Sequence, residues 1–131
     1  DWSVTGVQTC ALPICSLDVP LADGTSDEGY LAATQKALED SFSIFDPDII
    51  FYIAGADPYK EDRLGRLGVS QDGLLQRDRL VFCAAVANRV PIAIVCGGGY
   101  CNDLSMIAEI HAQTMREAAR QQQQLTKKNC E

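Results

Sequence analysis

Two short, uninterrupted apolar runs constrain this chain more than any other feature of its sequence. They are IIFYIA at residues 49–54 and PIAIVC at residues 91–96. Runs of this kind, rich in β-branched and aromatic side chains, are typical of strands that are buried on both faces of a parallel sheet. Helical patterns precede, separate and follow the two runs, so the expected order is helix, strand, helix, strand, helix.

The first helix has a start signal and a stop signal. Thr25 and Glu28 are spaced as in a capping box, in which each side chain bonds a free backbone N–H group at the helix start. The helix is expected to run from there to about Phe45 and to end before Pro47.

The second and third helices are expected to start at Ser70 and at Asn102 or Asp103, whose side chains can cap them. A polar tail with the tract Gln121–Gln124 follows, and it either extends the third helix or frays. The side chains expected on the apolar faces are Leu74, Val81, Phe82 and Ala85 in the second helix and Leu104, Ile107, Ala108 and Met115 in the third.

Strands that alternate with helices predict an α/β fold, a parallel sheet with right-handed crossovers and helices on both faces. In such sheets ligands bind just beyond the carboxyl ends of the strands. The first strand is followed there by Asp57, and the second by Gly97, Gly98, Gly99 and Tyr100. We therefore expect the carboxylate and the phenol to converge on one edge of the sheet.

The chemistry of these groups is consistent with a catalytic site, although each has a simpler interpretation. A carboxylate can bind a metal cation, and a phenol can donate a hydrogen bond to a developing oxyanion. Alternatively, Asp57 opens a turn with Pro58, and Tyr100 is buried with its hydroxyl bonded to backbone. The glycines could instead hold a phosphate at a helix N-terminus, although they lack the spacing of the known phosphate-binding motifs.

Three consecutive blocks of the sequence resemble the histone deacetylase family. They are DVPLADGTSDEGYL, FYIAGADPYKEDRLGRLGVSQDGLLQRD and VPIAIVCGGGY, and the resemblance covers roughly residues 16–118. Its specific elements are GAD, DRLG starting five residues after that Asp, and GGGY at the next strand end. The amino-acid sequence of these blocks is most similar to that of the class IV enzymes and their bacterial relatives, including the acetoin-utilization type. The resemblance implies an α/β fold of the arginase and deacetylase type.

The resemblance also implies roles for the residues at the two strand ends. Asp57 matches a zinc ligand, and Tyr100 matches the catalytic tyrosine that bonds the acyl carbonyl oxygen. Gly97, Gly98 and Gly99 would let the backbone pass close to the substrate, because no Cβ intrudes. The implied cofactor is Zn²⁺, which polarises the amide carbonyl and activates water, while a histidine acts as general base.

Other parts of the family's catalytic machinery are absent from the sequence. The Asp-x-His motif that supplies two more zinc ligands and the His-His pair that supplies the base do not occur, and the single histidine is His111. We therefore expect the chain to be the C-terminal part of a deacetylase that hydrolyses acyl-lysine amides. It is expected to be inactive by itself, with the activity belonging to a longer parent protein.

Three other functions are compatible with the sequence. The substrate could be an acetylpolyamine or another acetylated amine. The acyl group that is removed could also be a long-chain one. The chain could be a non-catalytic, deacetylase-like binding module. The glycine loop could also belong to a nucleotide-binding α/β domain.

The two ends of the chain are expected to lie outside the catalytic domain. VTGVQTCALPI at residues 4–14 resembles the translation of a DNA-sequencing adapter, so residues 1–14 are expected to be non-native. A native strand over this segment is the alternative. The partial deacetylase domain is then residues 15–120, and residues 121–131 form a polar tail.

The net charge, the length of the apolar runs and the cysteine pattern limit which binding partners and which cellular compartment are expected. The net charge of −7 argues against nucleic-acid binding, and no apolar run approaches the roughly 20 residues of a membrane span. None of the six cysteines forms a Cys-x-x-Cys pair, and Cys83 and Cys96 lie in patterns typical of buried, reduced thiols. A reducing, cytoplasmic location is therefore expected. The expected partner is an acylated lysine or acetylated amine.

Overall fold

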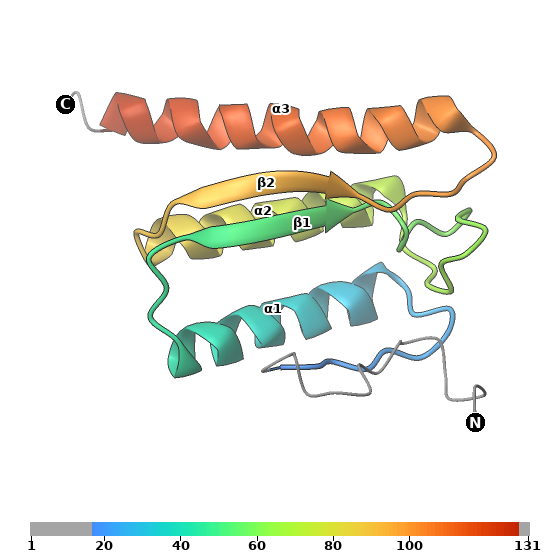
Figure 1. Ribbon diagram of the computed structural model, residues 1–131, viewed down its shortest axis with the longest axis horizontal. Coiled ribbons are helices and arrows are strands. Elements are labelled where there is room, and N and C mark those ends of the chain that lie inside the picture. Colours follow the sequence, from blue (N-terminus) through green and yellow to red (C-terminus); the bar gives the residue numbers. More distant parts are fainter. Residues whose placement is uncertain (1–16, 129–131) are drawn as a thin grey trace.

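The computed structural model describes residues 17–128, and its elements follow the predicted order (Figure 1). They are α1 (Asp27–Ile44), β1 (Ile50–Gly55), α2 (Gln71–Ala87), β2 (Ile92–Gly97) and α3 (Leu104–Lys128). The segment 1–14, predicted to be non-native, lies outside the described residues.

β1 and β2 form a parallel pair, with Ile50 opposite Ile92 and Gly55 opposite Gly97. In Figure 1, α3 lies beyond β2, α1 lies beyond β1, and α2 runs behind both strands. The fold is therefore α/β, with helices on both sides of a small parallel sheet, as predicted: α1 and α3 flank its two edges, and α2 lies against one of its faces. Because the strands are parallel and in register, both deliver their following loops to the same edge.

The predicted cap of α2 is confirmed, whereas the capping box of α1 is wrong. Ser70 Oγ accepts a hydrogen bond from the Gly73 N–H group at 3.0 Å. The N-cap of α1 is Ser26, and the Thr25 hydroxyl donates instead to the Ala22 carbonyl at 2.6 Å. The reason is that Thr25 stabilises the preceding turn, so it is not available to cap the helix.

Asp27, at the start of α1, joins that helix to the start of α2. Its two carboxylate oxygens accept hydrogen bonds from the Ser70 N–H group and the Ser70 hydroxyl, each at 2.6 Å. At the third helix, Asp103 accepts from the N–H groups of Ser105 and Met106, which confirms it as a cap. The tract Gln121–Gln124 continues α3 as helix through Lys128.

The core lies between α2, the sheet and α3. The apolar face predicted for α2 is confirmed, because Leu74, Val81, Phe82 and Ala85 are all buried. The face predicted for α3 is confirmed only at Ile107, which packs against the core. Ala108 is exposed, Leu104 is 76% exposed and Met115 is 40% exposed. α3 instead buries Ile110, Thr114 and Glu117. The reason is that Thr114 and Glu117 find polar partners on α2, which makes their burial favourable.

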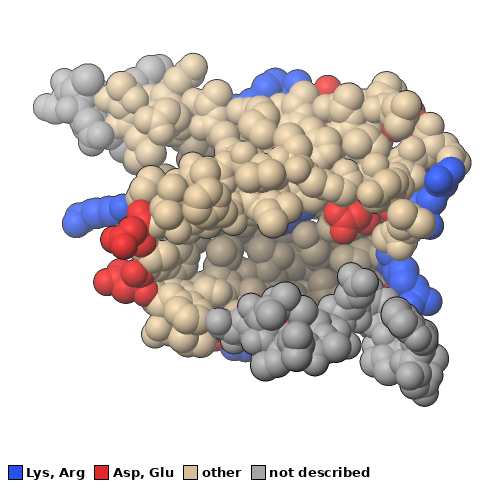
Figure 2. Space-filling model, in the orientation of Figure 1, with Lys and Arg blue, Asp and Glu red and all other residues tan. Residues whose placement is uncertain are grey.

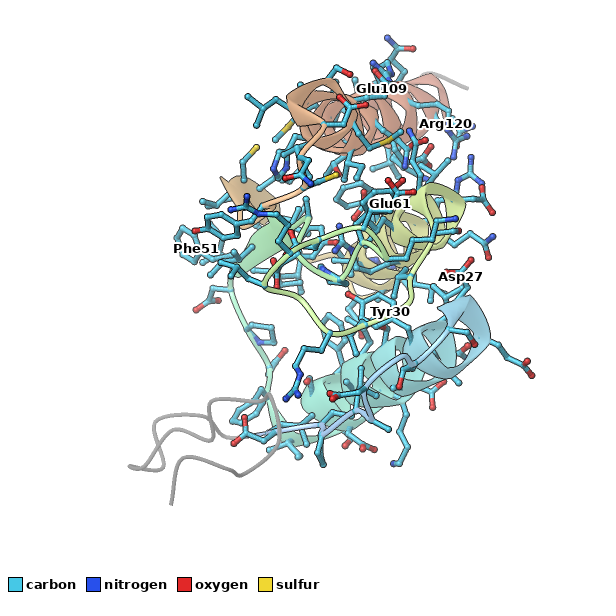
Figure 3. All side chains as sticks on the ribbon, turned by 90° about the vertical axis from the view of Figure 1, so that its right-hand side faces the viewer. Asp27, Tyr30, Phe51, Glu61, Glu109 and Arg120 are labelled. Carbon is cyan, nitrogen blue, oxygen red and sulfur yellow. The ribbon has the colours of Figure 1, made fainter. Side chains whose placement is uncertain are left out.

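Burial of the strands on both faces is also wrong for the described part of the chain. Phe51 and Ile53 are each 70% exposed, and Val95, which is the register partner of Ile53, is 47% exposed. Figure 3 shows Phe51 pointing away from α2, and Figure 2 shows charged side chains mainly at the two ends of this face of the molecule. α2 covers only the opposite side of the strands, so this side stays open to solvent.

Two further expectations concern the thiols and membranes. Cys83 and Cys96 are exposed rather than buried, whereas Cys101 is buried. All three are free thiols. Among the described helices, none combines the length and apolar character that a membrane crossing requires.

Candidate active site

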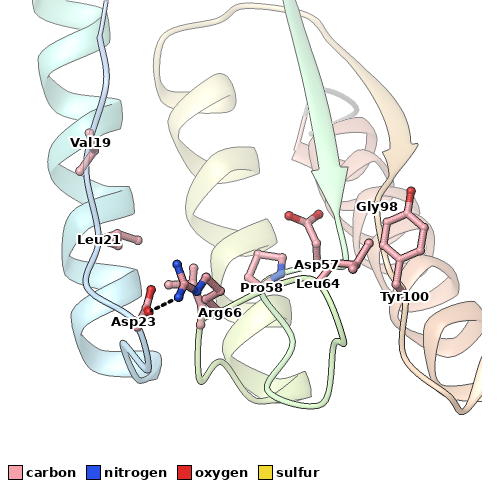
Figure 4. A pocket seen from close by; sticks show the side chains of 11 residues that line it. Val19, Leu21, Asp23, Asp57, Pro58, Leu64, Arg66, Gly98 and Tyr100 are labelled. Atoms are coloured by element: carbon pink, nitrogen blue, oxygen red, sulfur yellow. Dashed lines mark ion pairs between the residues drawn. The ribbon is translucent and has the colours of Figure 1, made fainter. Parts of the chain in front are cut away.

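A cavity of about 480 Å³ opens at the edge of the sheet where both strands end (Figure 4). Asp57 and Tyr100 both line it, so the structure brings together the two side chains that the strand pattern predicted would converge. Its other lining residues are Val19, Leu21, Asp23, Pro58, Leu64, Gly65, Arg66, Leu67 and Gly98.

Asp57 lies in the turn that follows β1, where the Tyr59 N–H group bonds the Ala56 carbonyl at 3.0 Å. The turn interpretation of Asp57 is thus correct for its backbone, while its exposed carboxylate faces the cavity. That carboxylate packs closely against two glycines, Gly55 and Gly98. A Cβ at Gly98 would lie 2.1 Å from Asp57 Oδ1, and a Cβ at Gly55 would lie 2.5 Å from it.

The three glycines after β2 have separate structural roles. Gly97 ends the strand, and its carbonyl accepts the Ala56 N–H group at 3.0 Å. Gly98 has a φ of 63° and leaves room for Asp57, so a side chain there would be both strained and obstructed. Gly99 has a φ of 101°, and a Cβ on it would lie 2.9 Å from Ile107.

A phosphate site at this loop is not supported by its geometry. Four residues separate Gly99 from the first residue of α3, and the Asp103 carboxylate already caps that helix N-terminus. A carboxylate in that position would repel a phosphate.

Tyr100 is 53% exposed, so the interpretation as a buried tyrosine is wrong. Its ring stands at the cavity beside Leu64, with the hydroxyl directed away from the backbone (Figure 4). The backbone is fixed where the side chain is not, because the Tyr100 N–H group donates to Asp62 Oδ2 at 2.5 Å. The phenol can therefore face a substrate while its main chain is held.

Asp62, in the DRLG motif, accepts three backbone hydrogen bonds. Besides Tyr100, the N–H groups of Leu64 and Gly65 donate to its Oδ1 at 2.8 and 2.7 Å. Burial raises the pKa of this carboxyl, but the three N–H groups outweigh burial and lower the pKa below its ordinary value. Asp62 is therefore held as an anion inside its own loop.

The sequence reasoning missed one wall of the cavity. Val19, Leu21 and Asp23 precede α1 and lie across from the strand ends, and Asp23 pairs with Arg66 at 3.2 Å (Figure 4). This segment has no periodicity, so the only sequence signal for it was its place in the first block of the family resemblance.

The sequence reasoning also missed the buried pair Arg77 and Asp78 behind the site. Arg77 Nη1 donates to the Gly55 carbonyl at 2.6 Å, which anchors the last residue of β1 two positions before Asp57. Asp78 balances the guanidinium, with 2.8 Å between Arg77 Nη2 and Asp78 Oδ1. Two adjacent charged residues inside a helical pattern were the available signal.

The described residues do not form the complete zinc site that the resemblance implies. Such a site needs three protein ligands as a rule. No cluster of three or more His, Cys, Asp or Glu side chains that could hold a metal occurs within residues 17–126. Two carboxylates, Asp57 and Asp23, line the cavity, and Asp23 is paired with Arg66, so these residues do not complete such a site.

The comparison with protein families identifies the domain. The Histone deacetylase domain matches residues 7–118. The match begins inside the segment 1–14, whose non-native origin stays a prediction. An uncharacterized protein of Picosynechococcus sp. is 40% identical over 102 residues, which are 78% of this chain and 34% of that protein. Histone deacetylase 2 of Arabidopsis thaliana is 33% identical over 103 residues, or 79% of this chain and 26% of that protein.

Solved structures agree with this assignment. A histone deacetylase homolog complexed with SAHA superimposes with a TM-score of 0.63 and 26% identity, covering 74% of this chain and 24% of the homolog. Acetylpolyamine aminohydrolase from Burkholderia pseudomallei gives a TM-score of 0.61 and 26% identity, covering 75% and 26%. The chain thus spans about a third or less of the relatives that it matches. It belongs to the histone deacetylase family.

Proposed function

We propose that this chain carries one zinc ligand, Asp57, and the catalytic tyrosine, Tyr100, of a deacetylase that hydrolyses acyl-lysine amides. The observation that supports this most directly is that both side chains line one cavity at the carboxyl ends of two parallel strands. The same positions were assigned these roles from the family's motifs. Family membership and geometry therefore favour the same interpretation, in which Asp57 is a zinc ligand and Tyr100 is the catalytic tyrosine.

Within this proposal, each residue has a chemical task. When bound, zinc supplies a Lewis acid for the amide carbonyl. Asp57 would hold the metal through a carboxylate oxygen, and the glycines beside it leave room for that carboxylate. The Tyr100 hydroxyl donates a hydrogen bond to the acyl oxygen as negative charge develops on it, which lowers the barrier because the donor is already in position.

The other zinc ligands and the general base are proposed to come from polypeptide outside this sequence. The relatives are about three or more times longer than the matched segment. The open side of the sheet, with Phe51 and Ile53 exposed, is consistent with burial against that further polypeptide. By itself the chain is expected to be inactive, because it supplies one ligand where three are needed.

A second candidate substrate has specific support. The likeness to an acetylpolyamine aminohydrolase is nearly as close as the likeness to the deacetylase homolog, with TM-scores of 0.61 and 0.63. Both substrates present an acylated primary amine, so the same zinc and tyrosine chemistry serves either.

The free thiols Cys83, Cys96 and Cys101 fit the reducing, cytoplasmic location that we also propose.

The test is to obtain the longer polypeptide that carries this sequence and to measure its zinc content and its hydrolysis of an acetyl-lysine peptide and an acetylated polyamine. Asp57→Asn should lower both zinc content and activity. Tyr100→Phe should keep the zinc and lower kcat by about 100- to 1,000-fold, as for the loss of one oxyanion donor. The exposed Asp72→Asn on α2 is the matched control. A zinc-free protein, or full activity in Tyr100→Phe, would refute the proposal.

A further inference from the structure

We propose that Asp62 is a positioning residue that holds Tyr100 and the Asp57 turn in fixed relation to each other. The proposal rests on the function proposed above for Tyr100 and Asp57, and it goes further because it assigns a role to a residue outside the set that reacts. The observation that carries it is that one carboxylate joins two loops that are far apart in sequence.

The two oxygens of Asp62 serve different loops. Oδ1 accepts the N–H groups of Leu64 and Gly65, at 2.8 and 2.7 Å, and so closes the turn of its own loop. Oδ2 accepts the N–H group of Tyr100 at 2.5 Å, across 38 residues of sequence. An isolated bridge between Asp62 and Cys101 runs antiparallel beside this contact. The carboxylate is thus the point at which the DRLG loop and the tyrosine loop meet.

The turn closed by Oδ1 also packs on the main chain of Asp57. A Cβ at Gly65 would lie 1.9 Å from the Asp57 carbonyl oxygen, so the two backbones are in close contact there. Any shift of the turn would therefore be passed to Asp57. Through Gly65 on one side and Tyr100 on the other, Asp62 connects both residues proposed to act on the substrate.

Tyr100 needs such a restraint because of the residues that precede it. Gly98 and Gly99 both have positive φ, and glycine has the widest conformational freedom of any residue. The ring of Tyr100 is 53% exposed, so contacts of its side chain hold it only in part. The hydrogen bond to Asp62 fixes the first residue after this pair of glycines.

A carboxylate suits this position better than an amide. All three partners are N–H donors, and an ionised carboxylate is purely an acceptor. In Asp62→Asn, one oxygen becomes an NH₂ group that would face an N–H donor. Placed at Oδ2 the NH₂ group would lose one hydrogen bond, whereas at Oδ1 it would lose two. It is therefore expected at Oδ2, where it disconnects the Tyr100 loop while the side-chain volume stays nearly the same.

The first experiment uses the 131-residue chain and needs neither zinc nor activity. In its ¹⁵N-labelled form, the Tyr100 amide is expected to be shifted downfield and protected from hydrogen exchange, although the side chain is exposed. Asp62→Asn should remove both signatures. Asp103→Asn, which alters the neighbouring helix cap, should leave them unchanged. A Tyr100 amide that exchanges freely in the unmodified chain would overturn the proposal even if no variant folded.

The second experiment measures kinetics in the longer polypeptide. Asp62→Asn is expected to lower kcat about 10- to 100-fold through misplacement of Tyr100, with little change in KM. In a Tyr100→Phe background it should lower kcat far less, because two changes that act through the same group are not additive. Equal losses in both backgrounds would show that Asp62 does not act through Tyr100. If Tyr100→Phe is fully active, the proposed function fails, while the amide measurement still decides the positioning.

Discussion

The two sides of the β1–β2 sheet differ in a way that reverses the usual relation between polarity and burial. On the side that α2 covers, called here the closed side, the fully buried Asp78 is surrounded by hydrogen-bond donors. On the opposite side, Phe51 and Ile53 are each 70% exposed. Large apolar side chains exposed together are unusual for a finished surface and typical of a contact face. The comparison teaches that only one side of this sheet is packed within the described residues.

The buried charges of the closed side are paired with each other and with polar side chains. The Tyr52 hydroxyl and Arg77 donate to Asp78 Oδ1, and the Thr114 hydroxyl donates to Oδ2 at 2.6 Å. Burial raises the pKa of Tyr52, which keeps its hydroxyl protonated and available as a donor. A buried carboxylate with both oxygens hydrogen-bonded is tolerated, but removal of one partner leaves the rest uncompensated.

The largest effect is expected from removal of the carboxylate at the centre of the closed side. Asp78→Ala should lower the free energy of unfolding by about 3–5 kcal/mol, because it leaves the Arg77 guanidinium buried without a counter-charge. Asp72→Ala, an exposed acid on the same helix, should cost less than about 1 kcal/mol. Urea unfolding followed by circular dichroism measures both. Similar losses for the two variants would mean that the buried network does not stabilise this side.

A pair of phenylalanines tests the contrast directly. Phe82 is 3% exposed on the closed side, and its ring lies 5.9 Å from that of Tyr52 in an edge-to-face arrangement. Phe82→Ala should cost about 3–5 kcal/mol of unfolding free energy. Phe51→Ala should cost less than about 1 kcal/mol in this chain, since its ring is already in water.

The same pair also tests what covers the open side. In the longer polypeptide proposed above, Phe51→Ala should become nearly as costly as Phe82→Ala. Thermal melting of the two variants in both contexts makes the comparison. A Phe51 variant that is harmless in both contexts would leave the open side as a free surface, and would contradict its burial in the longer protein.

Local patterns were sufficient to predict the elements and the convergence of the two strand ends. Ser70 caps α2 because cap and helix are adjacent in sequence. Asp57 and Tyr100 could be placed together because parallel strands share one edge. These predictions used only sequence neighbours and the topology that they imply.

Side-chain partners distant in sequence could not be predicted in the same way. The buried face of α3 was predicted only in part. Ile107 packs against the core as expected, but the apolar pattern also favoured the exposed Leu104 and Met115. It missed Thr114, which is buried with its hydroxyl bonded to Asp78, 36 residues away. The bond from Tyr100 to Asp62 spans 38 residues and depends on where one carboxylate points. Such contacts leave no periodic trace in the sequence.

The smallest effect concerns Glu117, which joins α3 to α2 at the margin of the closed side. Hydrogen bonding from Arg120 outweighs burial and, with Gln121 and Arg79, lowers the pKa of Glu117 to about 2 from its ordinary 4.5. A lowered folded-state pKa means that the contribution is complete above pH 4.5 and is lost as pH falls toward 2. The loss should be about 1–2 kcal/mol, because the arginine partners are half-exposed and therefore screened.

Glu117→Gln should flatten this pH dependence, whereas Glu109→Gln should not. Glu109 is also paired with an arginine on α3, but its side chain is 50% exposed, so it serves as the matched control. The measurement is the urea midpoint of each variant between pH 5 and pH 2.5. If both variants keep the slope of the unmodified chain, the acid sensitivity arises elsewhere, and the closed side owes its stability to the Asp78 network and its apolar packing alone.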